Sequence, residues 1–472
     1  MSWRRGSAIA LAIVVTSVSV LAGVSANASV TVVNSVLAGT PYAVAIAGRY
    51  AYTVNQTGNS VSRIDLVTGQ AITPFANLAG TSPSDIAISG NYAYTANYGS
   101  GTVSRIDLTN LDPNTNSITF ATPSATPQPA AIAILGSYAY VADGGGAYTI
   151  SRIDLAVTGG SPTLVATLSS TGGQLSDLAA AGNALYAVRL NGSDIARINL
   201  ANSPATVTDP LNTTSLGTEA RTLAIAGGYA YTANFGSQNI SRIDLSNGTT
   251  QQAWGTLPSG AAASGIAISG GYVYTSNYIG GNAVSQVSLA TGGAPVSTTP
   301  VPNSHTPFAI AAVNGVVVTA NLNSNSASVF GGYPVPSLAP TAQNLPGTVG
   351  RALNSTPVTP SNFWNAVSYT VSPALPAPLQ LNSTTGVISG TPNATLPATT
   401  FTITAADGID TATSTLTLTV AAVSPPAPSG ASSGLAASGA SATMPAAAAV
   451  AATLAGLLLL AAAAKARRRA SR

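Results

Sequence analysis

The sequence contains no cysteine, and only 6% of its 472 residues are charged. Globular domains usually carry roughly 25% charged residues, so this surface must owe its polarity to Ser, Thr, Asn and Gly. The lack of cysteine excludes thiolate nucleophiles and disulfide bonds. There is one histidine, His305, and one glutamate, Glu219. A multi-histidine zinc site is therefore excluded, and a Ser-His-Asp triad would have to use His305.

Positive charge is also missing from most of the chain. Of 16 basic residues, seven lie at the extreme ends, which leaves nine basic against 13 acidic residues between them, a net charge of −4. Nucleic-acid binding needs a dense basic face. We therefore expect no nucleic-acid partner. The terminal basic residues are Arg4, Arg5, Lys465, Arg467, Arg468, Arg469 and Arg472.

The first 28 residues have the pattern of a secretory signal. Two arginines precede an apolar stretch from Ala8 to Val24, and Ala26-Asn27-Ala28 offers the small residues that signal peptidase accepts. This predicts a signal peptide at residues 1–28, cleaved after Ala28. An uncleaved membrane anchor is the alternative.

The other end predicts an anchor. Residues 446–464 are uncharged and would form a helix about 28 Å long, enough to cross a bilayer core, and residues 465–472 form a basic cytoplasmic tail. A short motif precedes this helix within a Pro, Ala, Ser and Gly-rich stalk at residues 422–445. Its residues are Leu435, Ala436, Ala437, Ser438 and Gly439.

The order of short motif, apolar helix and basic tail resembles a sortase cell-wall sorting signal. The resemblance implies cleavage before Gly439 and attachment of Ser438 to the cell wall. Ser438 stands where that family usually has Thr, and Ala436 stands where it has Pro. A plain membrane-anchored ectodomain is the alternative.

An internal repeat dominates the rest of the chain. Residues 92–108 (YAYTANYGSGTVSRIDL) and 229–245 (YAYTANFGSQNISRIDL) agree at 13 of 17 positions. Diverged copies follow one another 42 to 47 residues apart, seven in all. Each copy contains short alternating segments separated by Gly-containing turns, and four short strands in about 40 to 45 residues is typical of a propeller blade. An α-solenoid is not expected, because no segment between residues 30 and 420 keeps a 3.6-residue apolar period.

The pattern therefore predicts an all-β fold, with a seven-bladed β-propeller at residues 29–335. The seventh copy lacks a fourth strand, and the segment 30–37 precedes the first complete copy. We expect residues 30–37 to complete the last blade, which would join the two ends of the ring and leave no free sheet edge.

The segments YTAN, Gly-Ser and VSRIDL are similar to YVTN-type β-propeller repeats. The resemblance implies a propeller fold in an exported protein, with surface or binding roles frequent. Lactonase-like propellers are neighbouring enzymes. An enzyme of that kind would use acidic and Arg side chains near the channel, and the candidates are Asp85, Asp177, Glu219 and Arg221.

A second domain follows at residues 336–421. The segment from Leu379 to Pro392, with its Thr-Gly turn and Ser-Gly-Thr-Pro ending, resembles the bacterial Putative Ig module. Segments 400–405 and 411–420 are expected to form a hairpin. The resemblance implies an Ig-like β-sandwich that acts as a spacer or adhesive unit.

Turns after the second strand of each repeat are the candidate ligand-binding rim. An Asn and an aromatic residue stand side by side there in three repeats: Asn97 and Tyr98, Asn234 and Phe235, and Asn277 and Tyr278. Exposed aromatic and amide groups commonly bind carbohydrate or protein ligands. The alternative is that each Asn caps its own turn. We also expect the repeated Arg and Asp residues, such as Arg105 and Asp107, to form charge pairs between blades.

The sequence thus predicts an exported protein, anchored to the cell wall or membrane through its C-terminus, that binds a glycan or protein on its propeller without catalysis. No metal or cofactor is expected. A lactonase-like enzyme acting on a lactone or sugar acid, and a surface-layer scaffold, are the alternatives.

Overall fold

The computed structural model describes residues 31–33 and 37–423, except residues 124, 126, 170–172, 191–192, 203, 213, 302–304, 332–335, 364–365 and 408–409. The predicted signal peptide with Ala28, most of the stalk, the motif at 435–439, the helix at 446–464 and the basic tail all lie outside this range. In the described part, no helix is long and apolar enough to cross a membrane.

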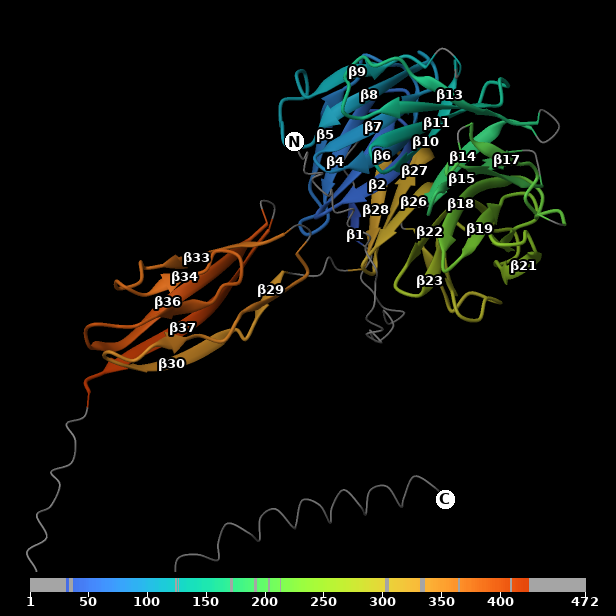
Figure 1. The fold of residues 1–472 in the computed structure, drawn as a ribbon. Coiled ribbons are helices and arrows are strands. Elements are labelled where there is room, and N and C mark those ends of the chain that lie inside the picture. The colour runs from blue at the N-terminus through green and yellow to red at the C-terminus, as the bar shows by residue number, and fades with distance from the viewer. Residues whose placement is uncertain are drawn as a thin grey trace, which may run out of the picture. The chain divides into compact units, whose positions relative to one another are not determined.

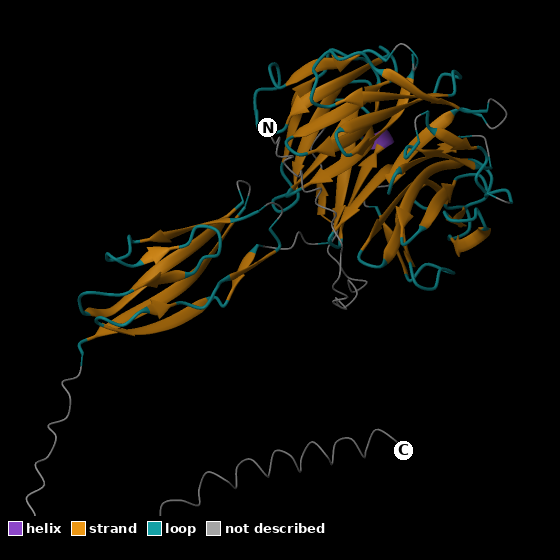
Figure 2. Ribbon diagram, in the orientation of Figure 1, coloured by secondary structure: helices purple, strands orange, loops and turns teal. Residues whose placement is uncertain are grey.

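Strands make up nearly all of the regular structure (Figure 2). Between residues 31 and 330 they form seven four-stranded sheets, and neighbouring strands within each sheet run antiparallel. The first three sheets contain β2 (Pro41–Ala47), β3 (Tyr50–Asn55), β4 (Ser60–Asp65) and β5 (Ala71–Asn77); β6 (Pro83–Ser89), β7 (Tyr92–Asn97), β8 (Thr102–Asp107) and β9 (Ser117–Ala121); and β10 (Pro129–Leu135), β11 (Tyr138–Asp143), β12 (Thr149–Asp154) and β13 (Thr163–Thr167).

The other four sheets repeat this order, and the last takes its outermost strand from the start of the chain. They contain β14 (Leu175–Ala181), β15 (Ala184–Arg189), β16 (Ile195–Asn199) and β17 (Thr206–Thr208); β18 (Ala220–Ala226), β19 (Tyr229–Asn234), β20 (Asn239–Asp244) and β21 (Thr250–Thr256); β22 (Ala262–Ser269), β23 (Tyr272–Ile279), β24 (Ala283–Ser288) and β25 (Ser297–Pro300); and β26 (Pro307–Val313), β27 (Val316–Asn321), β28 (Ser326–Phe330) and β1 (Thr31–Val33), with a short 3-10 turn, η3 (Leu322–Ser324).

The sheets close into a ring. The first strand of each sheet contacts the first strand of the next, and β26 contacts β2 (Figure 1). At the closure, β1 pairs with β28 in the register Val32 opposite Ser328. Leu37 donates its N–H to the carbonyl of Asn325 and packs between the first and last sheets. The predicted seam between the two ends of the ring is therefore confirmed.

Apolar side chains of the repeat fill the space between consecutive sheets. Tyr52 and Phe75 of the first sheet pack with Ile106 of the second, all at most 2% exposed. Full burial of one such side chain is worth roughly 1.5–3 kcal/mol. The same positions recur in each copy, so one short sequence builds every interface around the ring.

The repeated arginines stack on aromatic rings. The guanidinium carbon of Arg105 lies 4.8 Å from the ring centroid of Tyr92 and 5.0 Å from that of Phe120, and Arg63, Arg152 and Arg242 make equivalent contacts. None of these four arginines lies within ion-pair distance of a carboxylate in the described residues. The expectation of charge pairs between blades was wrong. An Arg stacked on a ring keeps water on its outer face, so it does not need a buried counter-charge.

The repeated aspartates cap turns. Asp107 accepts hydrogen bonds from the backbone N–H and the hydroxyl of Thr109, and these bonds lower the pKa of Asp107. Asp154 and Asp244 accept the N–H two residues ahead in the same way. The Asp at the end of the third strand in four of the sheets therefore fixes the turn that follows it.

The second domain is a β-sandwich with its own core. A mixed sheet of β30 (Ala342–Thr348), β37 (Thr411–Ala421), β36 (Leu396–Ala406) and β33 (Ser368–Ser372) is accompanied by β31 (Leu353–Asn354), β35 (Ile388–Gly390), β34 (Gln380–Leu381), β29 (Ser337–Ala339) and β32 (Thr359–Ser361). β36 and β37 pair antiparallel, as the sequence predicted. The core includes Phe401, Ile403, Leu416 and Leu418.

Breaking the seam should destabilise the whole ring. In a Val32→Pro variant, the loss of an N–H from β1 weakens the pairing with β28 and exposes a sheet edge. We expect a loss of about 1–3 kcal/mol in the free energy of unfolding. Val207→Pro in β17 is the matched control, because β17 is also a three-residue outermost strand but joins no chain ends. Urea unfolding measures both, and equal losses would contradict a special role for the seam.

Candidate functional site

Each innermost strand of the ring carries a β-bulge near its N-terminal end. In β6, the register with β7 shifts between Pro83 and Asp85, so Ser84 has no partner across the ladder. The same shift occurs in the first strand of all seven sheets. A bulge turns its extra residue out of the regular alternation. The bulged residues are Tyr42, Ser84, Ala130, Ser176, Arg221, Ser264 and Phe308.

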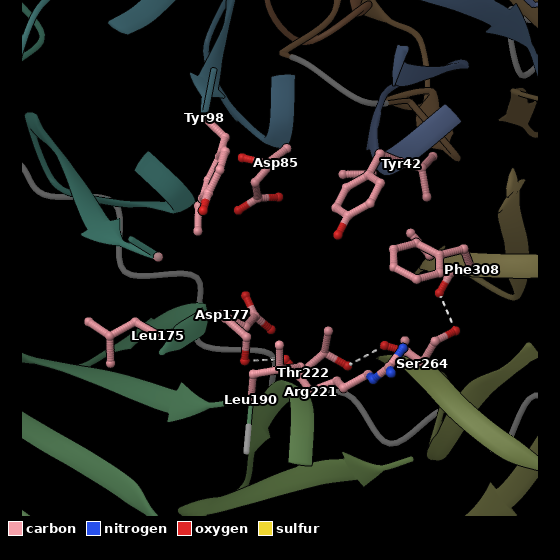
Figure 3. Close-up of a pocket in the computed structure, with 18 of the residues that line it drawn as sticks. Tyr42, Asp85, Tyr98, Leu175, Asp177, Leu190, Arg221, Thr222, Ser264 and Phe308 are labelled. Atoms are coloured by element: carbon pink, nitrogen blue, oxygen red, sulfur yellow. Dashed lines mark hydrogen bonds between the residues drawn. The ribbon is translucent and has the colours of Figure 1, made fainter. Parts of the chain in front are cut away.

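All seven bulged residues line one cavity of about 580 Å³ at the centre of the ring (Figure 3). The residue after the bulge also lines it in six sheets, and this position includes Asp85, Asp177 and Thr222. The ring therefore brings together side chains up to 266 residues apart in the sequence, from Tyr42 to Phe308. The volume is in the range of small-molecule sites.

The two carboxyl groups tie neighbouring bulges together. Asp85 accepts the N–H of Ile86 on its own strand at 2.8 Å and the N–H of Ile132 on the next sheet at 2.8 Å. Asp177 accepts the N–H of Leu178 at 2.7 Å and of Leu223 at 2.8 Å in the same arrangement. Both oxygens of each carboxyl group are thus engaged with backbone donors.

Burial changes the acidity of these groups. Desolvation raises the pKa of Asp85, and the charge of Asp177 raises it further, while the two N–H donors oppose the shift. Desolvation also raises the pKa of Asp177 against its own two donors. Both residues line the cavity and are partly buried, so their separation from water is partial. Because the pKa values of Asp85 and Asp177 are raised, these two groups carry less negative charge than ordinary Asp side chains at the same pH.

Arg221 is the one cation among the residues that line the cavity. Its guanidinium carbon lies 3.5 Å from the ring centroid of Phe235, and its Nη2 is 4.0 Å from a carboxyl oxygen of Glu219. Desolvation lowers the pKa of Arg221, and Glu219 partly opposes that shift. The side chain is 25% exposed, so it is held in place by stacking and still reaches the cavity.

Aromatic rings cover one wall beside Arg221. The rings of Tyr42 and Phe308 are 4.7 Å apart, and Tyr278 meets Phe308 edge-on at 5.5 Å. Burial raises the pKa of the Tyr42 hydroxyl, and the positive charge of Arg221 opposes this. Tyr98 lines the cavity from the second sheet, where its hydroxyl donates to Gln128 at 3.3 Å.

The three predicted rim asparagines are fully buried within their sheets. Asn97 accepts from the hydroxyl of Thr95 at 2.9 Å and donates to the hydroxyls of Thr102 at 3.1 Å and Ser104 at 2.9 Å. Asn277, Asn55 and Asn321 also bond to Thr or Ser hydroxyls, and Asn234 bonds to two such hydroxyls and to the amide oxygen of Asn239. Their amides therefore join the second and third strands of a sheet rather than capping a turn.

The three predicted rim aromatics lie on the cavity side of those turns. Tyr98 lines the cavity, Phe235 stacks on Arg221, and Tyr278 packs against Phe308. Ligand contact by any of the six predicted residues stays a prediction. Because the amide groups already have partners, the arrangement favours the aromatic members.

Of the four residues considered for a lactonase-like enzyme, Asp85, Asp177 and Arg221 line the same cavity, and Glu219 lies beside Arg221. His305 does not line it; its Nδ1 is 3.1 Å from the hydroxyl of Ser326. Within the described ranges, no group of three or more His, Cys, Asp or Glu side chains could hold a metal ion.

Sequence reasoning missed Tyr42, Phe308 and Ser264. Their shared signal is the variable position between a Pro, Leu or Ala and the apolar segment of each first strand. That position holds Tyr, Ser, Ala, Ser, Arg, Ser and Phe in the seven copies. Variation inside an otherwise regular repeat marks a position that the fold itself does not constrain.

The ring is similar to β-propellers among the solved structures. Virginiamycin B lyase from Staphylococcus aureus matches with a TM-score of 0.52 at 15% identity, over 64% of this chain and 99% of that chain. A catalytically inactive variant of that enzyme with quinupristin matches at 0.51 and 16% identity, over 64% and 98%. A chain of a mitotic checkpoint complex matches at 0.50 and 12% identity, over 65% and 94%. At such identities the likeness shows the fold alone.

Family comparisons agree with the two domains. Residues 335–421 match the family described as Putative Ig domain. Residues 80–103, 130–154 and 217–250 match the LVIVD repeat. No curated protein matches the sequence. The chain is therefore a β-propeller repeat protein with LVIVD repeats and an Ig-like domain.

Replacing a buried asparagine should lower stability and leave ligand binding by the folded protein unchanged. In Asn97→Ala, the hydroxyls of Thr95 and Ser104 lose a buried partner, at a cost of about 1–3 kcal/mol. The exposed Asn91→Ala in the same sheet is the control and should cost less than about 0.5 kcal/mol. Thermal unfolding followed by circular dichroism measures both. An unchanged midpoint for Asn97→Ala would contradict the structural role.

The raised pKa values of Asp85 and Asp177 predict that stability falls as pH rises. An unfolded Asp titrates near about 3.9, so above that pH the folded state holds more protons, and the free energy of unfolding decreases until both folded groups are ionised. Urea unfolding at pH 5 and pH 8 should show this fall, and a variant with both Asp85→Asn and Asp177→Asn should show a smaller one.

Asp107→Asn is the control for this pH dependence. The pKa of Asp107 is lowered, so its contribution is lost only as the pH falls through the acid range. This variant should keep the wild-type difference between pH 5 and pH 8. The same difference in the double variant and the wild type would contradict the role given to the cavity carboxyls.

Proposed function

We propose that this chain is an exported, surface-anchored binding protein whose propeller binds a ligand in its central cavity. In this proposal the ring is a seven-bladed propeller of the YVTN type, and the Ig-like domain serves as a spacer. The predicted signal peptide and C-terminal anchor would present both domains outside the cell.

The observation that carries the proposal is the composition of the cavity wall. Every sheet contributes its bulged residue, and these residues include a cation, two aromatic rings, one of them with a hydroxyl, and three serines. Ligand sites commonly combine apolar and aromatic walls with a few polar groups that fix orientation. A wall assembled from all seven sheets is also rigid, which lowers the entropic cost of binding.

Binding is favoured over catalysis by the state of the candidate catalytic groups. The oxygens of Asp85 and Asp177 already accept backbone N–H groups, which suits a structural role. His305 lies outside the cavity lining, so the chain's one imidazole is not among the groups that would face a ligand.

Glycan and matrix-protein arrays probed with the purified protein test this proposal. We expect a reproducible set of ligands, and Phe308→Ala, which removes one wall of the cavity, should weaken their binding by about tenfold. The exposed Leu164→Ala on β13 is the control and should have no effect. Silence across both arrays, or binding unaffected by Phe308→Ala, would count against a ligand site in the cavity.

A lactonase-like enzyme is the second candidate, because Asp85, Asp177 and Arg221 face one cavity. It predicts turnover of a lactone or sugar acid that falls when Asp85 or Arg221 is replaced by Ala. No turnover of a panel of lactones and sugar acids by the wild-type protein would remove this candidate.

A further inference from the structure

The guanidinium of Arg221 has hydrogen-bonding capacity that the protein leaves unused. Among the described residues, no hydrogen bond is made by any of its nitrogens, and Nε is shielded from solvent without a partner. The nearest carboxylate, Glu219, is at 4.0 Å, the outer limit of an ion pair, and its side chain is 47% exposed. Such a solvated contact contributes little.

The position of Arg221 suits a planar anion. Its stacking on Phe235 fixes the plane of the guanidinium, and the residue lines the cavity (Figure 3). A guanidinium held in this way can donate two parallel hydrogen bonds to a carboxylate. Because the fork is already oriented, little side-chain entropy is lost on binding.

The two carboxyl groups of the cavity are already engaged by backbone donors. The carboxyl groups of Asp85 and Asp177 accept two backbone N–H donors each, and partial burial disfavours their ionised forms. The hydroxyls of Tyr42 and Tyr98 also line the wall. Arg221 therefore carries the one lasting positive charge among the lining residues.

Beside Arg221, the wall offers aromatic surface. Tyr42 and Phe308 come from adjacent sheets, with centroids 4.7 Å apart, and Tyr278 supports Phe308 from behind the lining. Tyr42 and Arg221 line the same cavity. Such a surface packs against the face of an aromatic or sugar ring.

We propose that the cavity selects ligands that carry a carboxylate on a six-membered ring. Arg221 binds the carboxylate, Tyr42 and Phe308 contact the ring, and Glu219 competes weakly for the guanidinium. This inference rests on the proposed function, since it names the ligand class of the same cavity. Aromatic acids and sugar acids share this chemistry, and the experiment separates them.

Isothermal titration calorimetry on the purified full-length protein, with two matched pairs of probes, tests the inference. Benzoate is compared with benzamide, and glucuronate with methyl glucoside. We expect at least one acid to bind about tenfold or more tightly than its neutral partner, and the pair that shows the difference identifies the ring type. Equal binding of acid and neutral partner in both pairs overturns the inference.

Three variants assign the preference to Arg221. Arg221→Gln should abolish the difference between acid and neutral probe, whereas Glu219→Gln, which removes the competing carboxylate, should tighten acid binding several-fold. Arg351→Gln, an exposed arginine of the Ig-like domain, is the control and should change nothing. An acid preference that persists in Arg221→Gln, or acid binding weakened by Glu219→Gln, contradicts the assignment.

If Arg221→Gln does not fold by circular dichroism, Arg221→Lys keeps the charge without the planar fork and should lose part of the preference.

Two further results separate this inference from the proposed function. If neutral ligands from the arrays bind but no acid preference exists, the inference fails and the proposed function stands. If neither acids nor array ligands bind, both fail.

Discussion

One extra residue in each innermost strand determines what this ring can do. A regular strand would point alternate side chains into the interfaces between sheets, where the repeat needs small and apolar residues. The bulge releases one residue per sheet from that requirement and directs it to the central cavity. Seven positions are therefore free to vary while the fold stays the same. Three of them hold Tyr42, Arg221 and Phe308.

The low charge content follows from how the sheets are held together. Most sheets use a buried asparagine with Thr and Ser hydroxyls between the second and third strands, and stacked arginines on the outer part of the sheet. The fourth sheet differs: Arg189, 1% exposed, replaces the asparagine and pairs with Asp194 and Asp209 at 2.6 Å. Neutral hydrogen bonds need no paired charges, and the ring closes through β1 without a disulfide.

The repeat predicts most of the fold. Strand positions in the ring and the seam at β1 follow from periodicity, because each copy must bury the same residues. The hairpin of the second domain follows from two alternating segments, 400–405 and 411–420. The partners of polar residues were harder to predict. Arg105 was expected to pair with an acid and instead stacks on Tyr92, and Asn97 was expected at a rim but lies inside the sheet. Neither spacing nor composition distinguishes these options, since they depend on which side chains paired strands bring together.

A crystal structure of the protein soaked with the acid that binds more tightly in the calorimetry, benzoate or glucuronate, measures directly whether the bulged residues form a selective site. The result expected is an electron-density peak for the ligand in the central cavity, with the carboxylate within hydrogen-bond distance of Arg221 and the ring against Tyr42 and Phe308. An empty cavity at saturating ligand, or a peak confined to the outer surface of the ring, would contradict it.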